Sequence, residues 1–264
     1  MWGNVSRWQR WLRRPSGVST SFQPVQQIAP AVSMLPNSKE FYRSSLVEQQ
    51  PIRVSGNLSR DRIVANSSCD RYMLWIDGVG AWQLCVGSQF LIGGPTLEDT
   101  TPDICLMANL SRRHATLQRN GEDWFIHPHQ STVVSGRSVS KPTLLRTGDA
   151  ICLAERVRLG FRIPSVLSGS ALMDFESHHR PAHTVNGIIL MTDSVLLGPR
   201  KDHHICCAEW PELVVIYRQD GQLRCRSKAA MKINEDRVRD SAVLSDGAIV
   251  SGEDFRFRIE KLKA

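Results

Sequence analysis

The sequence predicts an all-β protein with two copies of one β-domain in tandem, preceded by a largely disordered N-terminal tail. From Tyr72 onward, short apolar segments recur about every 8–12 residues between turn residues. Their order in residues 72–165 is repeated in residues 184–264, and no long amphipathic helix interrupts either stretch. These features are typical of a β-sandwich or a barrel.

The tail, residues 1–70, is rich in Ser, Gln, Asn, Pro and Arg and lacks sustained hydrophobic periodicity. Such a composition buries too little apolar surface to offset the entropy of ordering, so we expect disorder. Residues 1–71 contain ten Lys and Arg but four Asp and Glu, and therefore carry most of the net charge of +7. The remainder is nearly balanced, which does not favour a nucleic-acid-binding body.

The beginning of the tail has apolar residues at helical spacing, among four arginines and before Pro15. These apolar residues are Trp2, Val5, Trp8, Trp11 and Leu12. The pattern predicts a short basic amphipathic helix over residues 2–14, which would dock on a partner or lie on an anionic membrane surface. A solvated, frayed tail explains the same residues equally well.

Three stretches of the first repeat predict strand pairs. In "ATLQRNGEDWFIHP" (115–128) alternating residues lead into a turn at Asn120-Gly121, which predicts a hairpin. The segment "TVVSGRSV" (132–139) turns at Ser135-Gly136. A third turn at Gly148-Asp149 precedes "AICLAERVRLGFRIP" (150–164), which predicts a strand, a turn and a strand.

The second repeat follows the first at an offset near 100 residues. "FLIGG" (90–94) matches "VLLGP" (195–199), and "LRTGDAI" (145–151) matches "LSDGAI" (244–249). We therefore predict one domain over residues 72–165, a linker over 166–183 and a second domain over 184–264.

At these residues the first repeat resembles a forkhead-associated (FHA) domain. The matching pieces are "FLIGG" (90–94), "LSRRHATLQRNG" (110–121), "VVSGRSV" (133–139) and "LLRTGDAICL" (144–153), in the family's order and spacing. The resemblance implies a β-sandwich that commonly binds phosphothreonine peptides. Residues 184–264 resemble a degenerate member, and the whole arrangement resembles the FHA-containing proteins of planctomycete-type bacteria.

The resemblance implies site residues one position at a time. It places the phosphopeptide-binding residues at Gly93, Ser111, Arg112 and Arg113. In the family pattern the glycine turns the chain beside the pocket, the serine hydroxyl binds the phosphate and the arginine after it is a second basic contact. Structural support of the site is implied for His114, Gly136, Gly148 and Asp149.

Two features of the family pattern are missing. The arginine that clamps the phosphate is replaced by Gly94, and the loop 127–132 lacks the asparagine that holds the peptide backbone. Since a guanidinium gives two charge-assisted hydrogen bonds and glycine gives one N–H, the first loss is the larger. In the second repeat Pro211 stands opposite Ser111 and Val214 opposite His114, which predicts that this repeat has no phosphate pocket and serves as a structural or protein-binding β-domain.

Other chemistry finds little support in the sequence. It contains no nucleophile elbow, P-loop, G-x-G-x-x-G or H-E-x-x-H, so we predict a protein that is not an enzyme and that uses no cofactor. We interpret the histidines at 127, 129, 178, 179, 183, 203 and 204 as ordinary surface residues that bind no metal.

The cysteines and the apolar runs suggest a compartment. The seven cysteines show no paired spacing and read as reduced, mostly buried thiols. The sequence has neither an apolar run long enough for a membrane span nor a signal peptide. We therefore expect a cytoplasmic protein.

Two function classes remain open. The first is a module that binds a partner protein, one phosphorylated on threonine if the resemblance extends to the site. The second is a scaffold or localisation protein whose basic, Trp-rich tail binds an anionic membrane surface or an acidic partner.

Overall fold

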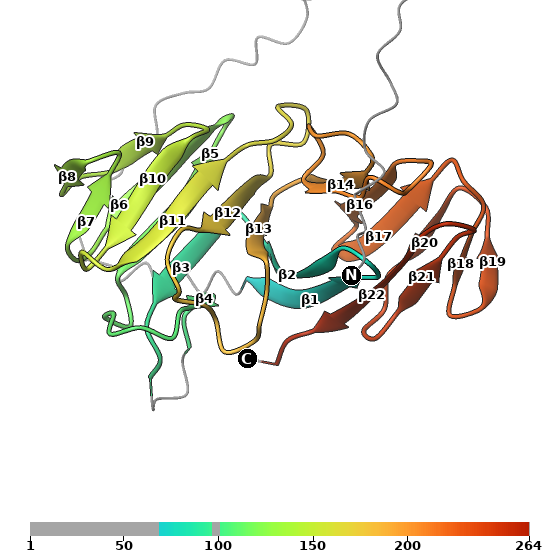
Figure 1. The fold of residues 1–264 in the computed structure, drawn as a ribbon, viewed down its shortest axis with the longest axis horizontal. Helices are drawn as coiled ribbons and strands as arrows, with labels where there is room; N and C mark the ends of the chain where they lie inside the picture. Colours follow the sequence, from blue (N-terminus) through green and yellow to red (C-terminus); the bar gives the residue numbers. More distant parts are fainter. Residues whose placement is uncertain (1–68, 97–100, 264) are drawn as a thin grey trace, which may run out of the picture. The chain divides into compact units, whose positions relative to one another are not determined.

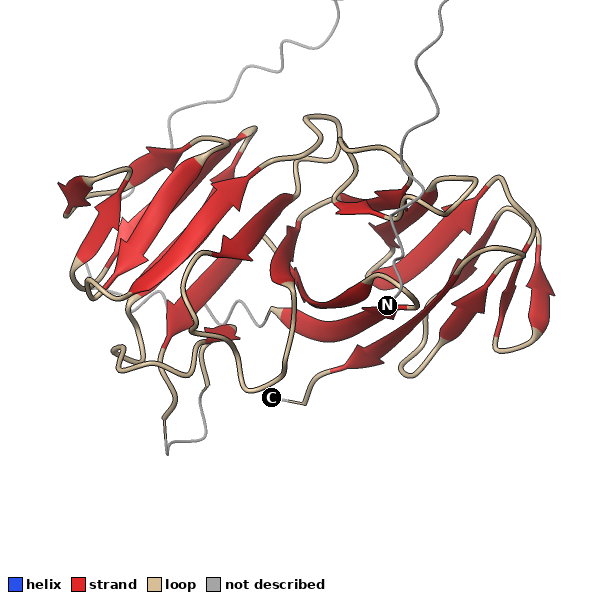
Figure 2. Ribbon diagram, viewed as in Figure 1, coloured by secondary structure: helices blue, strands red, loops and turns tan. Residues whose placement is uncertain are grey.

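A computed structural model of the chain describes residues 69–96 and 101–263 (Figure 1). Their regular structure is entirely β-strand, so the predicted all-β fold class is confirmed (Figure 2). Within this part of the chain no helix is long and apolar enough to cross a bilayer. The tail, with the helix predicted over residues 2–14, lies outside the described residues.

The strands are, in chain order, β1 (Asp70–Ile76), β2 (Gly80–Val86), β3 (Gln89–Gly93), β4 (Ile104–Cys105), β5 (Ala115–Asn120), β6 (Asp123–Pro128), β7 (Thr132–Val134), β8 (Arg137–Val139), β9 (Thr143–Leu145), β10 (Asp149–Leu153), β11 (Val157–Arg162), β12 (Ala171–Phe175), β13 (Gly187–Met191), β14 (Ser194–Gly198), β15 (Ile205–Cys206), β16 (Val214–Gln219), β17 (Gln222–Ser227), β18 (Met231–Ile233), β19 (Asp236–Val238), β20 (Ser241–Val243), β21 (Ile249–Ser251) and β22 (Arg256–Lys261).

The strands form three sheets. One long sheet has the order β19-β18-β21-β22-β1-β2-β13-β12-β11-β10-β7-β8, and two five-stranded sheets have the orders β4-β3-β5-β6-β9 and β15-β14-β16-β17-β20. The first five-stranded sheet packs on the half of the long sheet from β13 to β8, and we call this pair the first sandwich. The second packs on the half from β19 to β2, and we call that pair the second sandwich.

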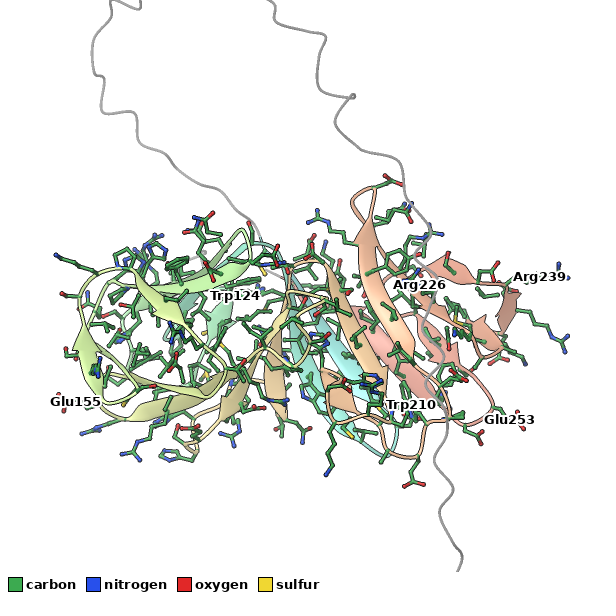
Figure 3. All side chains as sticks on the ribbon, turned by 90° about the horizontal axis from the view of Figure 1, so that it is seen from above. Trp124, Glu155, Trp210, Arg226, Arg239 and Glu253 are labelled. Atoms are coloured by element: carbon green, nitrogen blue, oxygen red, sulfur yellow. The ribbon has the colours of Figure 1, made fainter. Side chains whose placement is uncertain are left out.

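Each sandwich has a core centred on a tryptophan (Figure 3). Trp124 is 1% exposed and stacks on Phe90 at 5.9 Å between ring centroids. Trp210 is 4% exposed and lies 5.2 Å from the ring of Phe255. Large aromatic side chains fill each space between two sheets, as expected for a sandwich.

The two sandwiches have the same strand connectivity. Adding eleven to the labels in the sheet β4-β3-β5-β6-β9 gives the sheet β15-β14-β16-β17-β20. The same shift converts β8-β7-β10-β11 into β19-β18-β21-β22. The tandem arrangement that the sequence predicts is therefore visible in the strand order.

The hairpins that complete the long sheet are exchanged between the sandwiches. The hairpin of β1 and β2 precedes the first sandwich in the chain, but β1 pairs with β22, from Tyr72 with Lys261 to Ile76 with Phe257. Leu74 and Leu84 of this hairpin are buried in the second core. In its place β12 pairs with β11 and completes the first sandwich.

This exchange differs from the boundaries predicted from the sequence. Residues 72–86, which were assigned to the first domain, pack mainly on the second core, and the predicted linker 166–183 contains the buried strand β12. The reason is that β11 needs a neighbour, and the chain supplies it from the segment that follows rather than from the segment that precedes.

The strand β13 joins the two halves. It runs parallel to β2, from Gly187 with Trp82 to Met191 with Val86, so the two strands lie side by side between the sandwiches (Figure 1). Ile188 and Leu190 enter the first core, whereas Ile189 and Met191 enter the second. A strand that is buried on both faces reads as an unbroken apolar run, which explains "GIILM". Burying these four side chains contributes about 6–12 kcal/mol, comparable to the net stability of a domain.

A buried histidine ties the β11–β12 connection to the second sandwich. The Nε2 atom of His204 lies 2.9 Å from the Ser168 hydroxyl, and its Nδ1 accepts a hydrogen bond from the Leu196 N–H at 3.1 Å. Burial lowers the pKa of His204 to about 4. His203 and His204 are both buried, so their interpretation as surface residues was wrong; Gly198 and Leu196 lie close enough to enclose them.

The cysteines are all free, but only three of them, Cys85, Cys207 and Cys225, are buried. Three more are partly exposed and Cys206 is exposed, since it lies on the outward-facing side of the short strand β15.

We predict that the segment 69–165 will not fold alone, because it lacks β12 and β13 and carries a hairpin that belongs to the second core. The segment 87–193, which contains β12 and β13, should show more dispersed amide resonances and a more cooperative urea transition. Equal cooperativity of the two segments would contradict the exchange of hairpins.

We predict that His204 makes stability depend on pH. Between its pKa of about 4 in the folded protein and about 6.5 in the unfolded chain, the unfolded state binds more protons, so the free energy of unfolding rises with pH across this window. The total change is about 3 kcal/mol, and below this window the contribution is lost. Urea titrations across the window should give a shallower slope for His204→Asn, which keeps an acceptor for Leu196 N–H. An unchanged slope would show that His204 does not titrate in this way.

Candidate functional site

The loop between β4 and β5 carries the predicted phosphopeptide-binding residues. Ser111, Arg112 and Arg113 are consecutive and exposed, immediately before the buried His114. The Ser111 hydroxyl makes no hydrogen bond to any described residue, so it is available to a ligand from solvent. The structure thus presents a hydroxyl and two guanidinium groups on one short segment.

Two glycines allow this loop to lie directly on the end of β3. The N–H of Gly94 donates to the Ser111 carbonyl at 3.2 Å. A Cβ atom on Gly93 would lie 1.9 Å from the Arg112 carbonyl oxygen, and one on Gly94 would lie 2.4 Å from that of Leu110. Both contacts are with backbone atoms, which cannot move aside as a flexible side chain would.

Gly94 therefore has a structural reason to be glycine in this chain. The position where the family pattern has its clamping arginine is buried under the loop, and its N–H is already bonded to Ser111. The sequence shows that the arginine is missing; only the structure shows that no side chain fits there.

His114 anchors the base of the loop. It is 2% exposed, its Nε2 lies 2.9 Å from the Ser131 carbonyl oxygen, and its carbonyl accepts from the N–H groups of His129 and Gln130. Because a carbonyl only accepts, Nε2 carries the proton. His114 thus joins the start of β5 to the β6–β7 loop.

A second histidine borders the same loops. Thr116 Oγ1 lies 2.8 Å from His129 Nε2. Burial, followed by the positive charge of Arg113, lowers the pKa of His129. The imidazole consequently stays neutral at neutral pH and adds no charge of its own to the site.

The other three support residues lie elsewhere. Asp149 accepts from the Ser135 hydroxyl and from the Arg146 N–H, each at 2.6 Å. Gly136 and Gly148 take positive φ angles of 80° and 95° in the two adjoining turns. Both turns adjoin the Val134 end of β7. His114 instead contacts Ser131, which lies next to Thr132 at the opposite end of this strand. The structure therefore does not bring Gly136, Gly148 and Asp149 to the Ser111 loop.

Strand pairing corrects the alignment of the second sandwich. Ile92 pairs with Ala115, and Leu197 pairs with Val214. Counting back from Ala115 and Val214 places Leu213 opposite His114 and Trp210 opposite Ser111. The sequence suggested Val214 and Pro211 for these positions, so each assignment moves back by one residue. The shift arises because the two repeats differ in where the strand ends relative to its turn. Asn120 is the last residue of β5 and pairs with Asp123, whereas Asp220 already lies in the turn that follows β16.

The second sandwich consequently has a core residue at the position of Ser111. Trp210 is buried and packs against Phe255 and Phe257. An indole ring that fills the core offers no hydroxyl to a phosphate.

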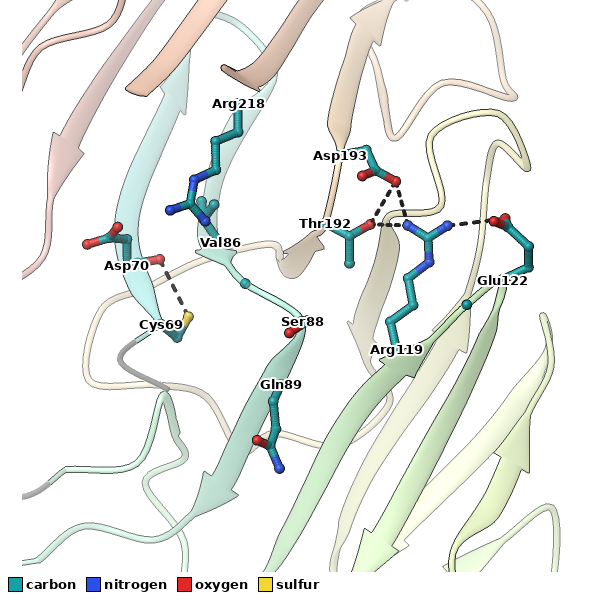
Figure 4. A pocket seen from close by; sticks show the side chains of 12 residues that line it. Cys69, Asp70, Val86, Ser88, Gln89, Arg119, Glu122, Thr192, Asp193 and Arg218 are labelled. Carbon is teal, nitrogen blue, oxygen red and sulfur yellow. Dashed lines mark hydrogen bonds and ion pairs between the residues drawn. The ribbon is translucent and has the colours of Figure 1, made fainter. Parts of the chain in front are cut away.

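A cleft of about 580 Å³ lies where the two sandwiches meet (Figure 4). Arg119 lies along it with its side chain 11% exposed, and donates to Asp193 at 2.5 Å, to Thr192 at 2.6 Å and to Glu122 at 3.2 Å. The guanidinium charge is thus balanced by two carboxylates within the protein, which makes Arg119 a tie between β5 and the β13–β14 turn. Nothing in the sequence marks this residue.

In the described part of the chain, no three His, Cys, Asp or Glu side chains are grouped closely enough to hold a metal ion.

Residues 92–154 match the model of the FHA domain family. No curated protein matches the sequence significantly.

Several solved structures also match. One, from a study of phosphothreonine-dependent FHA domain interactions, is 25% identical over 32% of this chain and 88% of its own, with a TM-score of 0.23. The FhaA FHA domain, solved in complex with an intracellular domain, is 25% identical over 32% of this chain and 92% of its own, with a TM-score of 0.23. The N-terminal FHA domain of EssC, a component of the bacterial type VII secretion apparatus, is 13% identical over 73% of this chain and 95% of its own, with a TM-score of 0.20.

The resemblance to the FHA domain family that the sequence indicates is therefore confirmed for residues 92–154, which lie in the first sandwich. FHA domains are protein-interaction modules. The residues matched, 92–154, include the Ser111 loop, His114 and both glycines beneath them.

We predict that Gly94→Ala will destabilise the protein by about 1–3 kcal/mol, because its Cβ overlaps the Leu110 carbonyl oxygen. Gly87→Ala is the matched control, since its Cβ would lie 3.8 Å from the nearest atoms in an ordinary contact. Urea unfolding of both variants measures the difference. If Gly94→Ala is as stable as Gly87→Ala, the loop does not lie on Gly94 as described.

Proposed function

We propose that the first sandwich binds a phosphothreonine-containing segment of a partner protein at the Ser111–Arg113 loop. The observation that carries this proposal is an exposed Ser111 hydroxyl without an internal partner, on a loop fixed from below within an FHA domain. A fixed loop loses little entropy when a ligand binds, so its hydrogen bonds contribute more to affinity.

The chemistry of the loop suits a phosphate. A phosphothreonine brings a charge of about −1.5 to −2 and three strong acceptor oxygens. The Ser111 hydroxyl would donate to one of them, while the guanidinium groups of Arg112 and Arg113 supply positive charge. Arg112 and Arg113 lie in the bend before β5, and the variants below separate their contributions.

In the proposed binding mode, the arginine that contacts the phosphate comes from the β4–β5 loop rather than from the end of β3. Since Gly94 is covered, introducing an arginine there would disturb the loop rather than restore a clamp. The second sandwich would then act as an FHA-like partner domain without phosphate recognition, because Trp210 occupies its serine position.

We predict that the full-length protein will bind members of a phosphothreonine peptide library more tightly than the same peptides without phosphate. Ser111→Ala should lower the affinity about tenfold, the loss expected for one hydrogen bond to a charged group. Fluorescence anisotropy with labelled peptides measures both effects.

Two further variants test which arginine of the loop contributes to phosphate binding. Arg112→Ala and Arg113→Ala separate the two guanidinium groups, and Arg137→Ala, an exposed arginine on β8, is the control. Equal binding of phosphorylated and unphosphorylated peptides, or unchanged affinity in Ser111→Ala, would refute the proposed site.

A further inference from the structure

The outer face of the second five-stranded sheet carries a row of positive charge. Along β17, Leu223 and Cys225 are buried in the second core, so the alternating residues Arg224 and Arg226 point outward. Lys228 continues this alternation just after the strand and lines the same groove as Arg226. Three cations therefore follow one another along a single strand direction.

The neighbouring outward positions are neutral. Tyr217 and Val215 of β16 pair with Arg224 and Arg226, and on the other side Val243 and Ser241 of β20 pair with the same two residues. The next strand contributes Ser194 and Leu196. None of these outward positions on the described strands is acidic.

The cations of this row have no carboxylate partner in the described part of the chain. Arg226 has its guanidinium 5.5 Å from the centre of the Tyr217 ring, and Arg224 donates to the Ser241 hydroxyl at 3.3 Å. Elsewhere in the second sandwich, Lys232, Arg256 and Lys261 each form an ion pair.

The pKa of Tyr217, which lies beside Arg224 and Arg226, is lowered on this face. A hydrogen bond from Ser241, together with the hydrogen bond and the positive charge of Arg224 and the charge of Arg226, holds this pKa below its usual value.

A groove of about 850 Å³ opens at the end of the row. It is lined by Glu212, Leu213, Val215, Arg226, Ser227, Lys228, Ala229, Ala230, Val238, Arg239 and Asp240. Ala229 and Val238 pack against the second core, which fixes its floor. Arg239 adds a fourth cation without an ion-pair partner among the described residues (Figure 3). The groove also contains two carboxylates, those of Glu212 and Asp240.

We infer that this face, from Arg224 to the groove at Lys228, docks an extended acidic segment of a partner protein. An extended chain repeats its side-chain direction every second residue, about 6.6–6.8 Å, which is also the spacing of Arg224 and Arg226 on β17; Lys228 follows just beyond the end of the strand. A segment with a carboxylate at every second position would therefore meet one cation with each carboxylate. Its intervening side chains would point away from this face, because successive residues of an extended chain face opposite ways.

The site differs from the one proposed above in place and in ligand. It lies on a sheet face of the second sandwich, requires no phosphate and does not involve the Ser111 loop. Each function can consequently fail without the other.

The test uses the full-length protein and a fluorescein-labelled peptide of alternating Glu and Val, with a peptide of the same composition whose Glu residues form one block. We expect the alternating peptide to bind more tightly than the block peptide, and to weaken as salt is added. Arg226→Glu combined with Lys228→Glu should lower its affinity about tenfold. Circular dichroism checks that the variant folds, which is expected because both side chains are exposed.

The control is Arg137→Glu combined with Lys141→Glu, which makes the same change in charge on exposed positions of the first sandwich. This variant should bind the alternating peptide as the unmodified protein does. The inference is overturned if both double variants lose affinity equally, since the tail or the net charge would then be responsible. It is also overturned if the two peptides bind equally, or if a single-stranded oligothymidylate binds to this face in preference to the alternating peptide.

Discussion

The parallel pairing of β2 with β13 is the constraint on which the rest of the structure depends. The two strands are about 100 residues apart in the sequence, and each places side chains in both hydrophobic cores. The hairpins are thereby exchanged, so that neither sandwich is complete without residues that are distant in sequence. Separate domains joined by a flexible linker would allow independent motion; here both sandwiches belong to a single compact unit.

The two sandwiches use one topology for different surfaces. In the first, two glycines at the end of β3 let the Ser111 loop lie on the sheet and expose a hydroxyl with two guanidinium groups. In the second, Trp210 fills the corresponding position and strengthens the core instead. An indole ring in the core thus stands where the first sandwich exposes a hydroxyl. What the second sandwich retains is a basic sheet face, which depends on strand alternation rather than on loop conformation.

Much of the fold could be predicted from local patterns. The turn at Ser135-Gly136 follows from residues that tolerate positive φ, and the structure gives them 46° and 80°. The histidines were harder: His203 and His204 look like surface residues in "KDHHICC", but tertiary contacts with Leu196 and Gly198 bury them. The alignment of the repeats was off by one residue because turn residues alone do not specify where a strand ends.

The sequence by itself determined the fold class, the repeat and the FHA resemblance, because alternation, turn chemistry and motif spacing are local properties of the chain. Only the tertiary structure decided which hairpin completes which sandwich, since an apolar strand such as "GIILM" is compatible with any neighbour that covers both its faces. It also decided the meaning of Gly94. The missing arginine is a fact of sequence, whereas the absence of room for any side chain comes from the Leu110 carbonyl, which approaches from a different loop.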